Sequence, residues 1–262
     1  MERTDDERTM ISGGAGGLQP EAGRMSSSWR DQWFNHPRHG PLPALLLVLT
    51  VATGVVDAVS ILALGRVFIA NMTGNVVFIG FALAGAPGFS LIASLLALAG
   101  FLLGAAAGGP VVTRFRESRG RLLAVVTTTE LVLLAGALLI AAVTGEPFTA
   151  TPRDLIVLVA ATALGLQNAA ARELAVPDAT TTVLTMTLTG FAADLRQRNG
   201  QVLLRRLLAV AAMLLGALAG AALVLRESAS WALALALLLV TVVCAGAWVF
   251  GRRPGGWQAS GR

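Results

Sequence analysis

The stretch VFIANMTGNVVFIGFALAG, residues 67–85, is apolar enough to enter a lipid bilayer, but four polar or small residues interrupt it. They are Asn71, Thr73, Gly74 and Asn75. Hydrocarbon offers amides and hydroxyls no hydrogen-bond partner. Polar or non-helical backbone at membrane depth is therefore tolerated only where protein buries it or where it lines a wet cavity. The stretch predicts a broken segment that avoids lipid and does not cross the membrane.

The rest of the chain has the composition of a membrane protein. Of 262 residues, 55% are hydrophobic and only 13% are charged, whereas a soluble domain carries about 25% charged residues. The apolar residues form blocks of the length that spans roughly 30 Å of hydrocarbon. We predict an all-α fold, a polytopic transmembrane helical bundle in the lipid bilayer. The apolar blocks are 42–63, 67–86, 90–112, 122–143, 154–172, 180–194, 204–225 and 229–250.

The arginines indicate how many blocks cross the membrane, since short cytoplasmic loops carry an excess of positive charge. Every basic residue is Arg, and arginines are dense at 114–121, at 196–206 and after residue 251. If all eight blocks cross, at least one of these segments lies outside. If blocks 67–86 and 180–194 enter and leave on one side, or stop part-way, all of them are cytoplasmic. We predict six full spans plus two broken or re-entrant polar segments, with both termini cytoplasmic.

The chain ends and the single cysteine complete this outline. Residues 1–40 are predicted to be a disordered cytoplasmic tail, 41–251 the transmembrane domain and 252–262 a cytoplasmic tail, without a removable signal peptide. Cys244 is the only cysteine, so it forms no intrachain disulfide and indicates no metal site. No cofactor is expected. The arginines lie in separate short loops rather than in one patch, which argues against nucleic acid as a partner.

The two halves of the chain resemble each other. GVVDAVS at 54–60 aligns with GLQNAAA at 165–171, and NMTGN at 71–75 aligns less closely with TMTLT at 185–189. Each half, about 42–143 and 154–250, contains a span, a polar segment and two further spans. Three crossings per half is an odd number, so the second copy is inverted, and a 3+3 inverted repeat is a design shared by many secondary transporters. The alternative is a chance similarity in sequence rich in Gly, Ala and Thr.

Asp57 is the most informative single residue. Thr50, Thr53, Asp57 and Ser60 lie on one stripe of the first predicted span. A charged Asp near the bilayer centre costs about 2.5–3.5 kcal/mol on insertion scales, so it is expected to face the bundle interior. One hypothesis makes Asp57 a ligand for an ion, a proton or a substrate. The other makes it a structural hydrogen-bonding group that fixes the broken segment, or one that Arg66 neutralises.

The other candidate residues also have two interpretations. The polar residues of the first broken segment offer hydrogen-bonding groups and a helix N-terminus to a solute, or they only allow tight helix packing. Amides and hydroxyls in the second half contribute to the same cavity, or they join helices. Glu130 couples transport to protons, or it is a packed or snorkelling side chain. The substrate or ion candidates are Asp57, Asn71, Thr73, Gly74, Asn75, Gln167, Asn168, Thr185 and Thr187, and the proton-coupling candidates are Asp57 and Glu130.

The elements GVVDAVS, NMTGN, GLQNAAAREL and TTTVLTMTLTG, in this order, resemble the YoaK family of bacterial integral membrane proteins. The resemblance covers residues 42–251 and implies a multi-pass protein of the bacterial inner membrane. Members are usually described as being of unknown function, sometimes loosely as permeases. Met186 stands where the family pattern leads us to expect Gly, so the two broken segments differ. The residues that match the motifs are Asp57, Thr73, Gly74, Asn75, Gln167 and Asn168.

Two function classes follow from these observations. The first is a secondary transporter or permease for a small polar or anionic solute, bound where segments 67–75 and 180–189 meet. The second is a non-transporting membrane scaffold or accessory subunit. The sequence contains no nucleophile elbow, phosphate-binding glycine loop or HExxH motif, so an enzyme is not expected. A homo-oligomer is compatible with the sequence, which does not define the solute, the direction or the coupling ion.

Overall fold

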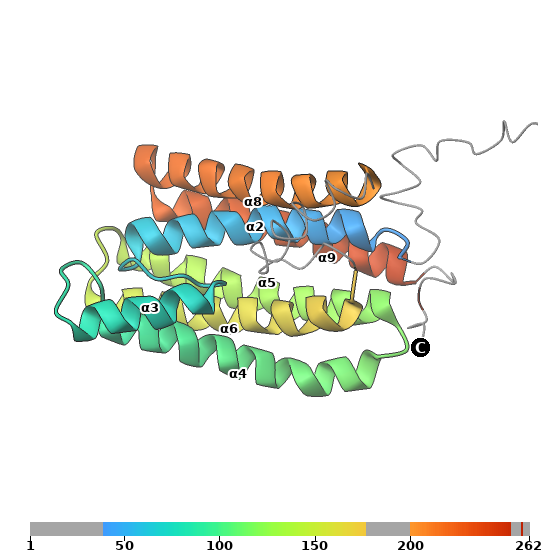
Figure 1. Cartoon of the computed structure of the whole chain (residues 1–262), viewed down its shortest axis with the longest axis horizontal. Coiled ribbons are helices and arrows are strands. Elements are labelled where there is room, and N and C mark those ends of the chain that lie inside the picture. The colour runs from blue at the N-terminus through green and yellow to red at the C-terminus, as the bar shows by residue number, and fades with distance from the viewer. Residues whose placement is uncertain (1–38, 177–199, 253–257, 259–262) are drawn as a thin grey trace, which may run out of the picture.

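The computed structural model describes residues 39–176, 200–252 and 258, and in these residues the chain forms seven α-helices (Figure 1). Six of them are long and apolar, and α3 is short. Their bounds are α2 Leu42–Ala63, α3 Met72–Leu83, α4 Leu91–Phe115, α5 Arg119–Thr144, α6 Ala150–Leu174, α8 Gly200–Arg226 and α9 Ala229–Gly251.

Six helices are long and apolar enough to cross a membrane, with spans of 22 to 26 residues. At 1.5 Å per residue, 22 residues rise about 33 Å, which matches the hydrocarbon thickness. The prediction of an all-helical bundle is therefore confirmed, and the described residues contain six helices that are candidates for the six predicted spans. Helix α3 has 12 residues and rises only about 18 Å. Residues 67–71 are not helical, so block 67–86 is interrupted as expected, whereas block 180–194 lies outside the described residues.

The six long helices form two layers of three. Helix α2 packs against α8 and α9, and α6 packs against α4 and α5. The layers meet chiefly where α5 contacts α9, with a smaller contact between α2 and α6. Figure 1 shows α2, α8 and α9 above α4, α5 and α6. Each layer therefore combines the first long helix of one predicted half with the second and third long helices of the other.

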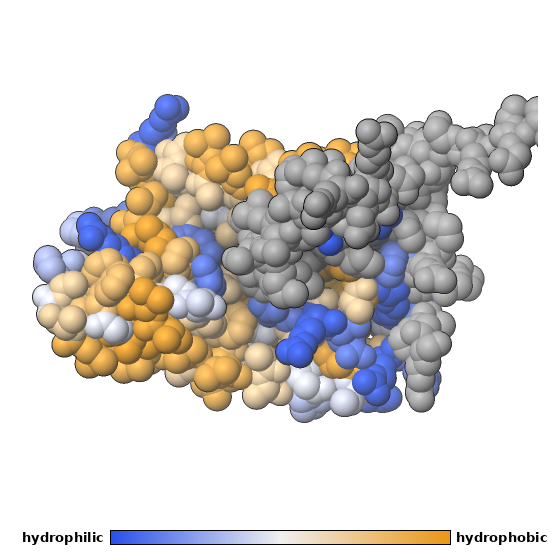
Figure 2. Space-filling model, viewed as in Figure 1, coloured by the Kyte–Doolittle hydropathy of each residue, from blue (hydrophilic) through white to orange (hydrophobic). Residues whose placement is uncertain are grey.

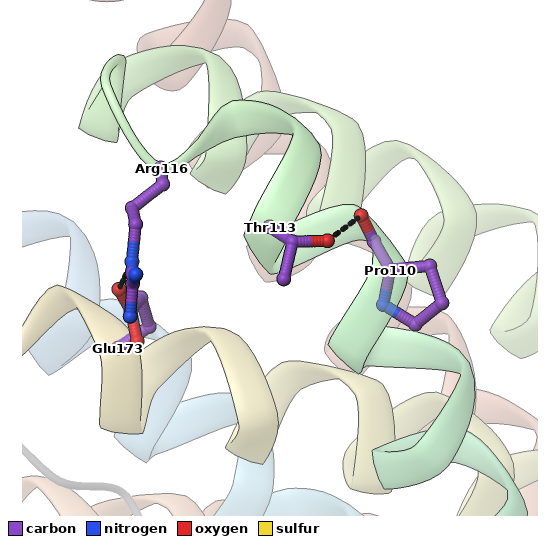
Figure 3. A network of polar contacts seen from close by, with 4 residues as sticks. All are labelled: Pro110, Thr113, Arg116 and Glu173. Carbon is purple, nitrogen blue, oxygen red and sulfur yellow. Dashed lines mark hydrogen bonds and ion pairs between the residues drawn. The ribbon is translucent and has the colours of Figure 1, made fainter.

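Local sequence explains where two helices begin and where one helix lacks a backbone donor. The hydroxyls of Ser90 and Ser228 accept hydrogen bonds from the amides of Ala93 (3.2 Å) and Trp231 (3.4 Å), so each serine caps a helix start. Pro110 lies inside α4 and removes one backbone donor there. The Thr113 hydroxyl donates to the Pro110 carbonyl at 2.9 Å (Figure 3).

Arginines are concentrated at one end of the bundle, where α4, α6 and α9 end and α2 and α5 begin. The Arg119 guanidinium is buried, donates to the Leu174 carbonyl and lies 3.1 Å from His39 Nδ1. Arg116 pairs with Glu173 at 3.0 Å on the surface of this end (Figure 3). Figure 2 shows apolar residues over the visible faces of α3, α4 and α8, with polar residues gathered toward the ends. The predicted grouping of the described Arg-rich segments on one side is therefore present.

Candidate functional site

The interruption between α2 and α3 is anchored on Asp57. After α2 the chain turns at Gly65 and Arg66, which have positive φ angles of 91° and 58°. It then runs back along α2, and Asp57 Oδ1 accepts hydrogen bonds from the amides of Ile69 (3.0 Å) and Ala70 (3.1 Å). Asp57 lies six residues before the end of α2, a depth of about 9 Å along the helix axis. The non-helical backbone therefore enters the bundle.

This inward segment is enclosed by protein. The side chains of Val67 and Ile69 are fully buried, and Ala70 is 4% exposed. Residues without helical hydrogen bonds at this depth need other partners, because lipid provides none. Asp57 provides them for two successive amides. Asp57 thus has the structural role that one of the two hypotheses assigned to it, and this role leaves its second oxygen uncommitted.

Asn75 holds the same segment from the other side. Its Oδ1 accepts from the Phe68 amide at 2.8 Å, and its Nδ2 donates to the Phe68 carbonyl at 2.7 Å. The side chain is fully buried. Asn75 therefore bonds both backbone groups of Phe68, and it ties the first turn of α3 back to the preceding segment. We refer to these two hydrogen bonds as the Asn75 clasp.

The other candidates in this segment lie differently. Asn71 and Thr73 are exposed at the start of α3. Gly74 lies under the Phe68 ring, where an added Cβ would approach the ring to 2.5 Å. Phe68 in turn stacks on Phe78 at 5.5 Å between ring centroids. Gly74 therefore makes room for the Phe68 ring of the preceding non-helical segment, rather than for a second helix as the packing interpretation expected.

Arg66 does not neutralise Asp57, so that part of the prediction is wrong. Its guanidinium lies over the Phe89 ring, 6.0 Å from the centroid, and next to Gly88. The turn at Gly65 and Arg66 directs this side chain toward the loop before α4. The two residues are close in sequence, but their side chains are bound to different parts of the fold.

Gln167 joins the two layers beside Asp57. Its Nε2 donates to Thr53 Oγ1 at 3.2 Å, which links α6 to α2. Thr53 lies one turn before Asp57 on the same stripe of α2, and Thr50, Thr53 and Ser60 all bond to carbonyls of their own helix. Asp57 Oδ2 and Gln167 Oε1 are buried and have no hydrogen-bond partner among the described residues.

The remaining candidates are distributed more widely. Asn168 follows Gln167 on α6 and is half-buried. Glu130 lies inside α5, 1% exposed, and its Oε2 has no partner within the described part of the chain. It is therefore packed and does not snorkel to the surface. Thr185 and Thr187 lie outside the described residues, as does the expected meeting of segments 67–75 and 180–189.

Glycines allow two very close contacts between helices. The contact between α2 and α8 has the same pattern as the contact between α6 and α4. An added Cβ at Gly54 of α2 would lie 2.4 Å from the Met213 carbonyl oxygen and 2.8 Å from the Ala217 nitrogen of α8. The equivalent Cβ at Gly165 of α6 would lie 2.1 Å from the Phe101 carbonyl oxygen and 3.0 Å from the Ala105 nitrogen of α4. Backbones approach this closely only where no side chain intervenes.

The match extends in both directions along these helices. Gly216 faces the Val51 carbonyl and Gly220 faces Val55 and Ala58. In the register that aligns Gly54 with Gly165, these three α2 residues align with residues of α6. Those residues make the corresponding contacts: Gly104 faces the Thr162 carbonyl, and Gly108 faces Leu166 and Ala169.

These features define a polytopic helical membrane protein. Its described residues contain six long apolar helices and an interrupted segment that buried polar side chains hold inside the bundle. The chain belongs to the family described as "Protein of unknown function (DUF1275)", whose sequence model matches residues 45–246. It is 32% identical over 154 residues to the UPF0700 transmembrane protein YoaK of Bacillus subtilis (strain 168). The matched residues make up 59% of this chain and 67% of that protein. The resemblance to the YoaK family is therefore confirmed. No solved structure gives a significant match.

Proposed function

We propose that this chain is a secondary carrier for a small polar solute, which binds between the two layers beside Asp57 and Gln167. One observation carries this proposal. Two buried oxygens, Asp57 Oδ2 on α2 and Gln167 Oε1 on α6, have no partner among the described residues, and Gln167 bonds to Thr53, one turn before Asp57. Buried polar groups are normally satisfied, so unsatisfied ones beside a broken helix favour a ligand. The uncommitted atoms are acceptors, so a solute with N–H or O–H donors suits them better than an anion.

The matched glycine contacts support an inverted repeat. Two halves that were alike only by chance in composition would not have the same helix pairs, the same register and the same backbone approach at Gly54 and Gly165. In inverted-repeat carriers one part of the protein moves against the other, so that the binding site opens first to one side of the membrane and then to the other side. Here the two layers are the bodies that would move relative to each other.

We also propose that segment 64–83 is re-entrant and that the Arg-rich end is cytoplasmic, with both termini inside. Helix α3 returns to the end where α2 stops and α4 begins (Figure 1). Single cysteines at positions 66 and 88, in a Cys244→Ala background, are expected to react with a membrane-impermeant maleimide from one side. A cysteine at position 117 is expected to react only from the other side. Reaction of positions 88 and 117 from the same side would contradict six spans.

A scaffold or accessory subunit remains the second candidate. Asp57 and Asn75 bond to backbone groups of the chain itself, which is all that a purely structural role requires. The two candidates differ in whether a free solute binds. A carrier has a ligand that stabilises the folded state by RT ln(1 + [L]/Kd), about 2.7 kcal/mol at 100 times Kd. A scaffold has no such ligand.

The test is a thermal-shift screen of the purified full-length chain against amines, amino acids, sugars, nucleosides and organic acids. We expect a donor-bearing compound to raise the unfolding temperature and then to be taken up by proteoliposomes. Gln167→Leu, which removes the unpartnered amide oxygen, is expected to abolish the shift. Asn71→Ala is the matched control at an exposed amide of the interrupted segment. A shift and uptake that survive Gln167→Leu unchanged would contradict the proposed site.

A further inference from the structure

Asp57 links the two layers as well as fixing a loop. Its own helix, α2, belongs to the layer with α8 and α9, whereas α3, which follows the bound segment, packs on α4 in the other layer. The hydrogen bonds from Ile69 and Ala70 to Asp57 Oδ1 therefore hold a segment attached to one layer against a helix of the other. Breaking these two bonds would loosen the connection between the layers.

The carboxyl group of Asp57 is buried, and the part of the chain that the structure describes places no cation in an ion pair with it. Asp57 is 5% exposed. The charged residues on the elements around α2 lie near helix ends or in the turn, and α9 carries none. They are Arg66 in the turn, Arg153, Asp154, Arg172 and Glu173 on α6, and Arg205, Arg206 and Arg226 on α8. Of these, Arg66 lies over Phe89, Arg153 pairs with Asp154 at 2.9 Å, and Glu173 pairs with Arg116.

The choice of ligand for Asp57 Oδ2 follows from the number of oxygens. A metal cation such as Ca²⁺ or Mg²⁺ requires about six or more oxygen ligands. Among the described buried side chains of α2 and α6, two oxygens lack a partner, Asp57 Oδ2 and Gln167 Oε1, which is fewer than an all-protein cage for such a cation provides. An ionised carboxylate at membrane depth is costly unless it is paired. A proton on Oδ2 removes that charge and requires no further ligands.

We propose that Asp57 is a proton-binding site and that protonation of Oδ2 weakens the hold of Oδ1 on the Ile69 and Ala70 amides. This inference rests on the proposed carrier function, for which it supplies the coupling ion. Hydrogen bonds to an ionised acceptor are roughly twice as strong as bonds to a neutral one. Deprotonated Asp57 thus ties the layers together through the interrupted segment, and the proton, taken from the aqueous phase, releases them.

The first experiment is a pH titration of the wild-type chain in lipid. Infrared spectroscopy with ¹³C-labelled aspartate monitors the protonation of the carboxyl groups at each pH. A protonated carboxyl band that shifts with the label is expected to persist at pH values where surface aspartates are fully ionised, and to disappear at higher pH. The label separates Asp57 from Glu130, which is also buried. Absence of a label-sensitive protonated band above the range of the surface aspartates would overturn the proposal, as would a band that persists to high pH without titrating.

The second experiment tests the release of the segment. Amide hydrogen exchange of residues 64–75 is measured at a fixed pH, in wild type and in Asp57→Asn, which mimics the neutral carboxyl group. We expect the exchange rates of the Ile69 and Ala70 amides to be several-fold higher in Asp57→Asn than in the wild type. In Glu130→Gln we expect these rates to equal those of the wild type. Equal protection in all three would overturn the release step. If Asp57→Asn fails to fold, exchange in the wild type above and below the measured titration, corrected for intrinsic rates, decides instead.

Failure of this inference is distinguishable from failure of the carrier proposal. Solute uptake that does not respond to a pH gradient, together with an Asp57 that does not titrate, leaves a carrier without proton coupling. An Asp57 that titrates and releases the segment, in a chain that transports no solute of the screen, leaves the proton site and removes the carrier.

Discussion

The Asn75 clasp gives the sharpest prediction about stability. Asn75→Ala removes both partners of the Phe68 backbone, which are bonded at 2.8 and 2.7 Å by a fully buried side chain. Each buried backbone group left unpaired costs about 1–3 kcal/mol, so the variant is expected to lose about 2–6 kcal/mol. For a chain of this size, roughly 2–4 °C of unfolding temperature corresponds to each kcal/mol. The expected decrease is on the order of 10 °C.

Cys244 provides the assay. It is the only cysteine of the chain and it is buried and unoxidised. A fluorogenic maleimide should therefore react with it only as the bundle unfolds on heating. Asn71→Ala is the control, because Asn71 is exposed and surface substitutions usually change stability by less than about 0.5 kcal/mol. If Asn75→Ala and Asn71→Ala both unfold at the wild-type temperature, the interrupted segment does not depend on the clasp, and the account of Asn75 given above is refuted.

Two further predictions concern packing and the Arg-rich end. Gly54→Ala places a Cβ 2.4 Å from the Met213 carbonyl oxygen and is expected to lower the free energy of unfolding by about 1–3 kcal/mol. The control is Gly136→Ala, whose Cβ would have nothing within 4 Å and which should be neutral or slightly stabilising. The same thiol assay measures both variants. Arg119→Ala leaves the Leu174 carbonyl without its buried donor and is expected to lose about 1.5–3 kcal/mol. Arg116→Ala breaks an exposed ion pair (Arg116 side chain 58% exposed) and should lose at most about 1 kcal/mol. Equal losses in the two arginine variants would contradict the burial argument.

The six long helices were predictable because a helix that spans the hydrocarbon core needs about 20 consecutive, mostly apolar residues, and such blocks are visible in the sequence. Each apolar block in 42–63, 90–112 and 229–250 corresponds to a described helix within a few residues. The interruption of block 67–86 was predictable for the same reason, since asparagines there have no partner in lipid. These inferences use only the local balance between apolar length and polar content.

The partners of the candidate residues were not predictable from that balance. Asp57 accepts hydrogen bonds from the amides of Ile69 and Ala70. Every residue type except proline has a backbone amide, so the sequence does not show which amides a side chain will bond. Sequence distance suggested Arg66 instead, but a turn with two positive φ angles sends that side chain to Phe89. The exchange of helices between the halves, with α2 joining α8 and α9, was also unforeseen. It depends on close backbone contacts at Gly54 and Gly165, whose identity was visible in the sequence but whose partners were not.

The register of the repeat leads to one further step. Aligning Gly54 with Gly165 places Asp57 opposite Asn168, so the two halves share their packing but differ at the position where charge matters. An amide cannot take up a proton in the range where a carboxyl group does. If Asp57 controls the connection between the layers as proposed, only the first half responds to protons, and each cycle involves one proton at this position. Asp57→Asn makes the two halves chemically alike, and because Asp57 also belongs to the proposed solute site, solute exchange should decrease, while the exchange that remains should no longer respond to a pH gradient.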